Sequence, residues 1–174
     1  MMNNYKNFVE IIDSNPFDFI PAKRQTYFDY LVETEKNKLE VIGKNKAGSL
    51  ICLYNGQDNK KPSPVIWLDS ERSPSGIFTD TLEMFFSILP YGMGLIHRIL
   101  LQAIDINNNF KNTANCEKLQ NEYQKILDRN RKILPVYEKI MNIKIELEPC
   151  ENIFKSISKH MIITERIIKK NNDL

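Results

Sequence analysis

The chain has 174 residues, of which 42% are hydrophobic and 26% are charged, a composition typical of a soluble globular protein. Its formal net charge of +2 gives no electrostatic reason to expect binding to nucleic acid or to a membrane surface. No apolar run is long enough to span a bilayer, and residues 1–6 lack the apolar stretch of a signal peptide. We expect residues 1–174 to form a single domain, because a chain of this length buries about 70% of its unfolded surface.

The three cysteines, Cys52, Cys116 and Cys150, are an odd number without paired spacing. Small secreted domains instead use an even set of cysteines as a disulfide framework. The pattern therefore predicts reduced thiols. Together with the missing signal peptide it indicates a cytoplasmic protein.

Residues 1–36 are predicted to form an N-terminal helical segment. Tyr5 and Phe8 belong to an apolar stripe that predicts a short amphipathic helix. Residues 17–21 alternate apolar and polar side chains between two prolines, and we expect them to be extended. A second helix is predicted from about residue 22 to residue 36, because its aromatic and aliphatic residues share one helical face.

Four short runs between residues 38 and 79 predict strands. Each is rich in β-branched or aromatic residues and is closed by polar or turn-forming residues. The runs cover residues 39–42, 49–54, 64–69 and 77–79. Because the links between them are short and polar, we expect an antiparallel meander.

A helix is predicted directly after these strands. Asp80 is its expected N-cap, and Glu83 completes a capping box. Its apolar face consists of Leu82, Phe85, Phe86 and Leu89. We expect it to lie across the second and third strands, with Trp67, Phe85, Phe86 and Leu89 buried. The sheet and this docked helix occupy residues 38–91.

Residues 92–174 are predicted to form the C-terminal helices. One helix follows the break at Gly92, a longer one runs from Cys116 to Leu134, and the last covers about residues 151–170. Residues 136–148 fit both a helical stripe and, in their second half, the alternation of a strand. We favour a short helix to about Asn142 and an extended link to Pro149. The fold class is therefore α+β, a small antiparallel sheet of about four strands with helices before and after it.

The strands at residues 50–53 and 65–68 are apolar at every position, whereas a half-exposed antiparallel strand alternates. Either both faces of the sheet are covered, or one face offers an apolar patch to a partner. The number of predicted helices favours the first alternative.

The residue types that carry catalysis or bind metal are scattered. His97 and His160 are the only histidines and have no cluster of cysteines around them, as a zinc site needs. Cys52 lies within a predicted strand, which is typical of a core thiol. Asp69 and Glu71 could form an acidic catalytic pair, but charges in such a turn are more typically solvated. We expect no metal, no cofactor and no enzymatic activity.

Several segments resemble the SUKH superfamily. Residues 64–71, Pro-Val-Ile-Trp-Leu-Asp-Ser-Glu, are similar to its "PVVxLGSEG" strand and turn, and residues 79–89 are similar to its "sFxeFLxLL" helix. Residues 137–140 and 147–152 also resemble the tail of some members. The resemblance covers roughly residues 38–91 and this tail, about half of the chain.

The resemblance implies a non-enzymatic protein-binding module of bacterial origin. Many members are immunity proteins that neutralise a cognate toxin, often a nuclease or deaminase. The alternatives are a regulatory or structural adaptor and a small enzyme with an unrecognised site.

Partner contact is expected on two charged loops held by the sheet, because loops vary while the scaffold holds them in place. These loops are residues 57–61 and the turn 69–72, which we expect to be exposed and adjacent. The predicted contact residues are Asp58, Asp69, Glu71 and Arg72.

Overall fold

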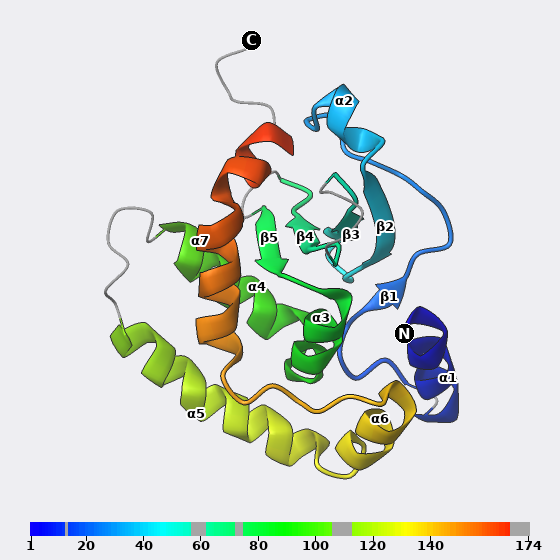
Figure 1. Ribbon diagram of the computed structural model, residues 1–174. Coiled ribbons are helices and arrows are strands. Elements are labelled where there is room, and N and C mark those ends of the chain that lie inside the picture. The colour runs from blue at the N-terminus through cyan, green and yellow to red at the C-terminus, as the bar shows by residue number, and fades with distance from the viewer. Residues whose placement is uncertain (13, 57–61, 72–74, 106–112, 168–174) are drawn as a thin grey trace.

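A five-stranded antiparallel sheet lies at the centre of the protein, and helices surround it (Figure 1). The fold class is α+β, as predicted, with five strands where about four were expected. The structure, a computed structural model, describes residues 1–12, 14–56, 62–71, 75–105 and 113–167.

The sheet is a meander in which the strands pair in chain order. They are β1 (Ile20–Pro21), β2 (Leu39–Lys44), β3 (Leu50–Tyr54), β4 (Val65–Leu68) and β5 (Gly76–Thr79). Ile51 pairs with Trp67, and Cys52 pairs with Ile66. Because side chains alternate along a strand, Ile51 and Trp67 face one side of the sheet, and Cys52 and Ile66 face the other.

Seven α-helices and one short 3-10 helix lie among the described residues. They are α1 (Met2–Ile12), α2 (Glu33–Lys36), α3 (Leu82–Ile88), η1 (Leu89–Tyr91), α4 (Met93–Asp105), α5 (Thr113–Asn130), α6 (Leu134–Met141) and α7 (Pro149–Ile167). In Figure 1, α7 runs along β5 at one edge of the sheet, while α1 and α6 pack together below the other edge. The first and last parts of the chain therefore meet the same central sheet.

The first face of the sheet, which carries Ile51, Val65, Trp67 and Phe78, packs on an aromatic core. The prediction that Trp67, Phe85, Phe86 and Leu89 are buried is confirmed, since each is 0% exposed. Four further aromatic residues come from the N-terminal segment, namely Tyr5, Phe8, Phe17 and Phe19. Gly43 lets Phe19 approach β2, because a Cβ at this position would lie 2.2 Å from the Phe19 ring.

Helix α3 docks on the sheet differently from the prediction. It contacts the sheet chiefly at β5, where the Phe85 ring meets Phe78 at 5.8 Å, rather than across β3 and β4. The predicted N-cap is also wrong. Thr81 caps the helix by accepting a hydrogen bond from the Met84 amide at 3.0 Å, because the carboxylate of Asp80 is occupied by side chains of α7.

The second face of the sheet is also covered, which confirms the favoured alternative. Its side chains form a separate apolar cluster that includes Leu50, Cys52, Ile66, Leu68 and Ile77. The cover is an irregular segment, residues 22–32, together with the end of α7 at Ile167. The predicted helix over residues 22–36 is therefore wrong except for α2. Aromatic side chains of this segment pack on the sheet from an irregular backbone.

Side chains occupy both edges of the sheet. Beyond the short β1, the Gln25 amide group accepts a hydrogen bond from the Val41 amide (2.8 Å) and donates one to the Val41 carbonyl (3.1 Å). The Tyr27 hydroxyl donates to the Leu39 carbonyl at 2.7 Å. At the opposite edge, the Ile77 amide donates to the Thr164 hydroxyl of α7 at 3.3 Å. These contacts cover backbone groups that an open edge would offer to another chain.

The C-terminal helices follow the prediction with one break. The predicted helix from Cys116 to Leu134 ends at Asn130, and α6 begins at Leu134 with Pro135 in its first turn, where a proline is well tolerated. Helix α6 ends at Met141, and its C-cap Asn142 has a left-handed conformation with φ of 55°. The extended link from there to Pro149 is as predicted.

Candidate functional site

The structure changes the interpretation of the predicted contact residues. Asp58 and Arg72 lie outside the described residues. Asp69 is only 8% exposed, because its carboxylate accepts hydrogen bonds from the Ser49 hydroxyl (3.0 Å) and the Glu71 amide (2.9 Å). The expectation that Asp69 is an exposed charge is therefore wrong, since it closes the turn after β4. Glu71 is exposed, as expected.

The chain enters and leaves β4 at opposite ends of that strand, and one predicted contact loop is attached at each end. Strands β3 and β4 are antiparallel neighbours, so the connection that holds residues 57–61 joins β4 at Val65. The turn at residues 69–72 leaves the same strand at its other end, after Leu68. At about 3.3 Å per residue, these two ends are roughly 10 Å apart. Residues 57–61 and Arg72 lie outside the described residues, so the adjacency of the two loops stays a prediction.

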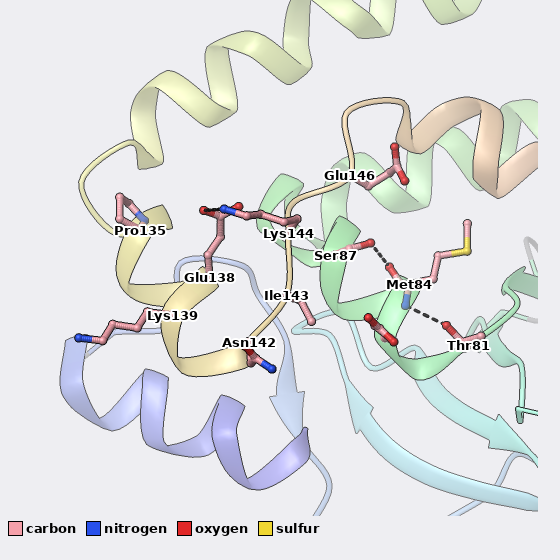
Figure 2. Close-up of a pocket in the computed structure, with 11 residues that line it drawn as sticks. Thr81, Met84, Ser87, Pro135, Glu138, Lys139, Asn142, Ile143, Lys144 and Glu146 are labelled. Carbon is pink, nitrogen blue, oxygen red and sulfur yellow. Dashed lines mark hydrogen bonds and ion pairs between the residues drawn. The ribbon is translucent and has the colours of Figure 1, made fainter.

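A groove of about 830 Å³ lies between α3, α6 and the extended link that follows α6 (Figure 2). We call it the α3–α6 groove. Its lining residues are Thr81, Glu83, Met84, Ser87, Pro135, Glu138, Lys139, Asn142, Ile143, Lys144 and Glu146.

Hydrogen bonds tie the three walls of the groove together. The Tyr137 hydroxyl of α6 donates to the Phe86 carbonyl of α3 at 2.6 Å. In the link, the Glu146 amide donates to the Ser87 carbonyl at 3.0 Å, and the Glu146 carbonyl accepts a hydrogen bond from the Tyr91 hydroxyl at 2.5 Å. The groove is therefore pre-organised, which lowers the entropic cost of binding.

The N-terminal segment supports α6 from the side away from the groove. The Tyr137 ring meets Phe8 and Phe17 edge-to-face, with centroids 5.0 and 5.2 Å away, a favourable aromatic geometry. The Asn4 side chain also donates a hydrogen bond to the Ile140 carbonyl at 3.1 Å. Residues at least 120 positions apart in sequence thus hold one wall in place.

The groove carries charges of both signs. Three glutamates against two lysines give its lining a net charge of −1, counted over Glu83, Glu138, Glu146, Lys139 and Lys144. Glu138 accepts a hydrogen bond from the Ile145 amide (3.2 Å) and lies 3.7 Å from the Lys144 ammonium group. In Figure 2, Lys139 extends away from α3 at the far side of the groove.

The side chains that line the groove can form hydrogen bonds and ion pairs with a ligand. The lining contains no histidine, cysteine or aspartate, and the Ser87 hydroxyl donates to the Met84 carbonyl of its own helix at 2.7 Å. Beside the groove, burial and the neighbouring Glu146 carboxylate raise the pKa of Tyr91 to about 12. Tyr91 therefore remains a hydrogen-bond donor at neutral pH, and the lining offers hydrogen bonds and ion pairs to a ligand.

Away from the groove, Cys52 is buried in the core and Asp80 is held by two side chains of α7. Burial raises the pKa of the Cys52 thiol, which disfavours the reactive thiolate. His160 lies 2.9 Å from one oxygen of Asp80, and Lys159 lies 2.5 Å from the other. Burial alone would raise the pKa of Asp80, but these two partners lower it below its ordinary value. The cluster joins α7 to the turn after β5.

Within the part of the chain that the structure describes, no group of three or more His, Cys, Asp or Glu side chains could hold a metal ion. In the same residues, no single helix combines the length and the apolar character that crossing a membrane requires.

The sequence contained a partial signal for the groove. The alternation of residues 143–148 predicted an extended link after α6, and the Asp80 to Leu89 pattern predicted α3. Nothing in the pattern indicated that the link contacts α3 through Ser87, because that contact joins residues 59 positions apart.

Comparison with protein-family models, with curated proteins and with solved structures finds no match to this chain.

Proposed function

We propose that this protein is a non-enzymatic protein-binding module that holds its partner in the α3–α6 groove. More specifically, we propose an immunity protein of the SUKH type that neutralises a cognate bacterial toxin in the cytoplasm. The resemblance of residues 64–71 and 79–89 supports the second statement, and the groove supports the first.

The observation that carries the proposal is the pre-organised lining of the groove with its charges of both signs. Five of its eleven residues are charged, and Met84, Pro135 and Ile143 are the apolar ones among them. Charges of both signs around a small apolar centre are typical of a protein–protein contact, in which they select the partner and speed association.

Co-expression with the product of the neighbouring gene tests the proposal, with bacterial growth and the affinity of the purified pair as readouts. The double variant Glu83→Lys, Lys139→Glu reverses two exposed groove charges and leaves the net charge unchanged. We expect it to weaken binding about tenfold or more and to reduce growth rescue.

A matched control is Glu71→Lys with Lys125→Glu, which also exchanges two exposed charges without changing the net charge. It should bind like the wild type. If only the control weakens binding, the contact surface is not the α3–α6 groove. A neighbouring product that is not toxic would contradict the immunity function, and one that does not bind would contradict the proposed partner.

A further inference from the structure

A second pocket, of about 550 Å³, lies at the opposite side of the sheet from the aromatic core. It is bounded by residues 20–26 on one side and by β2 and the start of β3 on the other. We call it the β1–β2 pocket. It shares no lining residue with the α3–α6 groove.

The floor of the β1–β2 pocket is apolar. Val41 and Leu50, which are 4% and 6% exposed, belong to the core of the second face. Ile20, Pro21 and Ala22 line the pocket and are half-buried. A ligand that enters here would place an apolar group against the side chains of the sheet.

The charged part of the lining is cationic, and Thr26 adds a neutral hydroxyl. Lys23, Arg24 and Lys44 all line the pocket and are exposed, and no carboxylate lines it. None of the three forms an ion pair with a described residue, unlike the nearby Lys46, whose ammonium group lies 3.9 Å from Asp18. Their charges are therefore available to an anion.

We propose that the β1–β2 pocket binds a small amphiphilic carboxylate, with its apolar chain on the Val41 and Leu50 floor and its carboxylate among Lys23, Arg24 and Lys44. The volume falls within the range of pockets for small ligands, and an apolar lining with a few convergent charges is typical of them. Charge complementarity selects an anion. This inference is independent of the proposed function of the α3–α6 groove.

The backbone beside the pocket favours a small molecule over an extended acidic peptide. A peptide would gain most of its binding energy by adding a strand to the edge of β2. The Gln25 side chain already forms hydrogen bonds with both the amide and the carbonyl of Val41 at this edge. The Ala22 amide likewise donates a hydrogen bond to the Ile42 carbonyl at 3.0 Å. Because these backbone groups are already hydrogen-bonded, a ligand in the pocket would contact side chains instead.

Titration of the full chain with decanoate, followed by amide NMR shifts and calorimetry, tests the proposal. We expect saturable shifts at Val41, Gly43, Lys44 and Leu50. Decanol should bind at least several-fold more weakly because it lacks the charge, and acetate should not bind because it lacks the chain.

The triple variant Lys23→Glu, Arg24→Glu, Lys44→Glu should bind decanoate about tenfold more weakly or worse, because three exposed attractions become repulsions. Its matched control reverses Lys125, Arg131 and Lys132, which are exposed on α5 and just after it. The control should bind like the wild type. As a second variant, Ala22→Phe adds bulk to the lining and should abolish binding without a charge change, with the fold verified by circular dichroism.

Several results would overturn the inference. They are the absence of saturable decanoate binding, equal binding of decanol, shifts that map away from β2, and equal losses in the triple variant and its control. Displacement of decanoate by an oligoglutamate peptide would also overturn it, since such a peptide has no apolar chain to fill the pocket.

Discussion

The two faces of the sheet are covered by different means. On the first face, helices α1, α3 and α4 contribute a dense apolar core, in which Phe85 contacts Phe19 and Phe78 with ring centroids 5.2 and 5.8 Å away. On the second face, the irregular segment of residues 22–32 and the end of α7 form the cover. The first cover is regular and aromatic, whereas the second depends on a few apolar anchors and many polar contacts.

The polar contacts of the second cover show how an irregular segment is held on a sheet. The Val32 amide donates to the Ile167 carbonyl at 2.9 Å, and the Tyr30 hydroxyl donates to the Asp69 carbonyl at 2.6 Å. Just after the segment, Glu35 of α2 accepts hydrogen bonds from Lys38 (2.7 Å) and Tyr54 (2.9 Å). A backbone without helical hydrogen bonds needs such partners, because unpaired buried polar groups are costly. The second face also carries the β1–β2 pocket, where this cover is incomplete.

The largest expected effect tests the first face. Phe85→Ala should lower the free energy of unfolding by about 3–5 kcal/mol, because it removes a fully buried ring from a packed core. Urea denaturation measures the loss. The control Ile162→Ala, at a side chain that is 73% exposed, should change stability by less than about 0.5 kcal/mol. A loss below about 1 kcal/mol for Phe85→Ala would contradict this description of the core.

A smaller loss is expected on the second face. Leu31 is 0% exposed, and Leu31→Ala should cost about 2–3 kcal/mol, the lower part of the range for such substitutions. The reason is that an irregular segment relaxes into the vacated space more readily than packed helices do. The same denaturation assay measures it. A loss as large as that of Phe85→Ala would show that the two covers are equally rigid.

A pH-dependent effect is expected at Glu35. Burial alone would raise the pKa of Glu35, but the hydrogen bonds from Lys38 and Tyr54 outweigh it and lower the pKa below 4.5. A carboxylate with a lowered pKa stabilises the folded state above its unfolded pKa, and this contribution is lost as the pH falls through the folded pKa. Glu35→Gln should therefore cost about 1–2 kcal/mol at pH 7, and the difference from the wild type should shrink below pH 4.5.

Denaturant titrations at several pH values measure the Glu35 effect. Glu33→Gln is the control, because the Glu33 side chain is 82% exposed, and its cost should be small at every pH. A Glu35→Gln penalty that stays constant down to pH 3 would contradict an ionised Glu35 in the folded protein.

The smallest expected effect concerns the edge of the sheet. Gln25→Ala removes two hydrogen bonds to Val41 but leaves those backbone groups accessible to water, so the cost should be about 0.5–1 kcal/mol. Hydrogen exchange of the Val41 amide should become faster, while that of Trp67 in the sheet centre should not. Gln124→Ala, which removes an exposed contact with Asp128, is the control. Unchanged exchange at Val41 would mean that Gln25 does not protect this edge.

Most of the regular elements could be predicted from local patterns. The β-branched run that ends at Leu68 is typical of a strand, and the apolar stripe that includes Phe85 repeats with the period of a helix. Because each pattern lies within one segment, the meander, helix α3 and the buried aromatic residues were predicted correctly. The prediction was wrong where a polar side chain has a distant partner. Asp80 is held by Lys159 and His160 instead of capping α3, and Gln25 pairs with β2 where a helix was predicted.

The candidate sites were less predictable than the fold. Asp69 lies in a segment whose composition is typical of an exposed turn. Its carboxylate is nevertheless buried, where it accepts a hydrogen bond from Ser49. The residues of the α3–α6 groove come from three elements, and their proximity depends on contacts such as Tyr137 with Phe86. Neither partner is close in sequence, and no periodic pattern encodes such a contact.

The sequence by itself determined which segments are strands and amphipathic helices, because hydrophobic periodicity is a local property that each segment carries. It also determined that two of the strands are apolar on both sides, which favoured a sheet with both faces covered. Only the tertiary structure decided that residues 22–32 form the second cover without becoming a helix, and that the link after α6 meets α3. The physical reason is that hydrogen bonds and packing between distant residues override local propensity when they satisfy more of the buried polar and apolar groups.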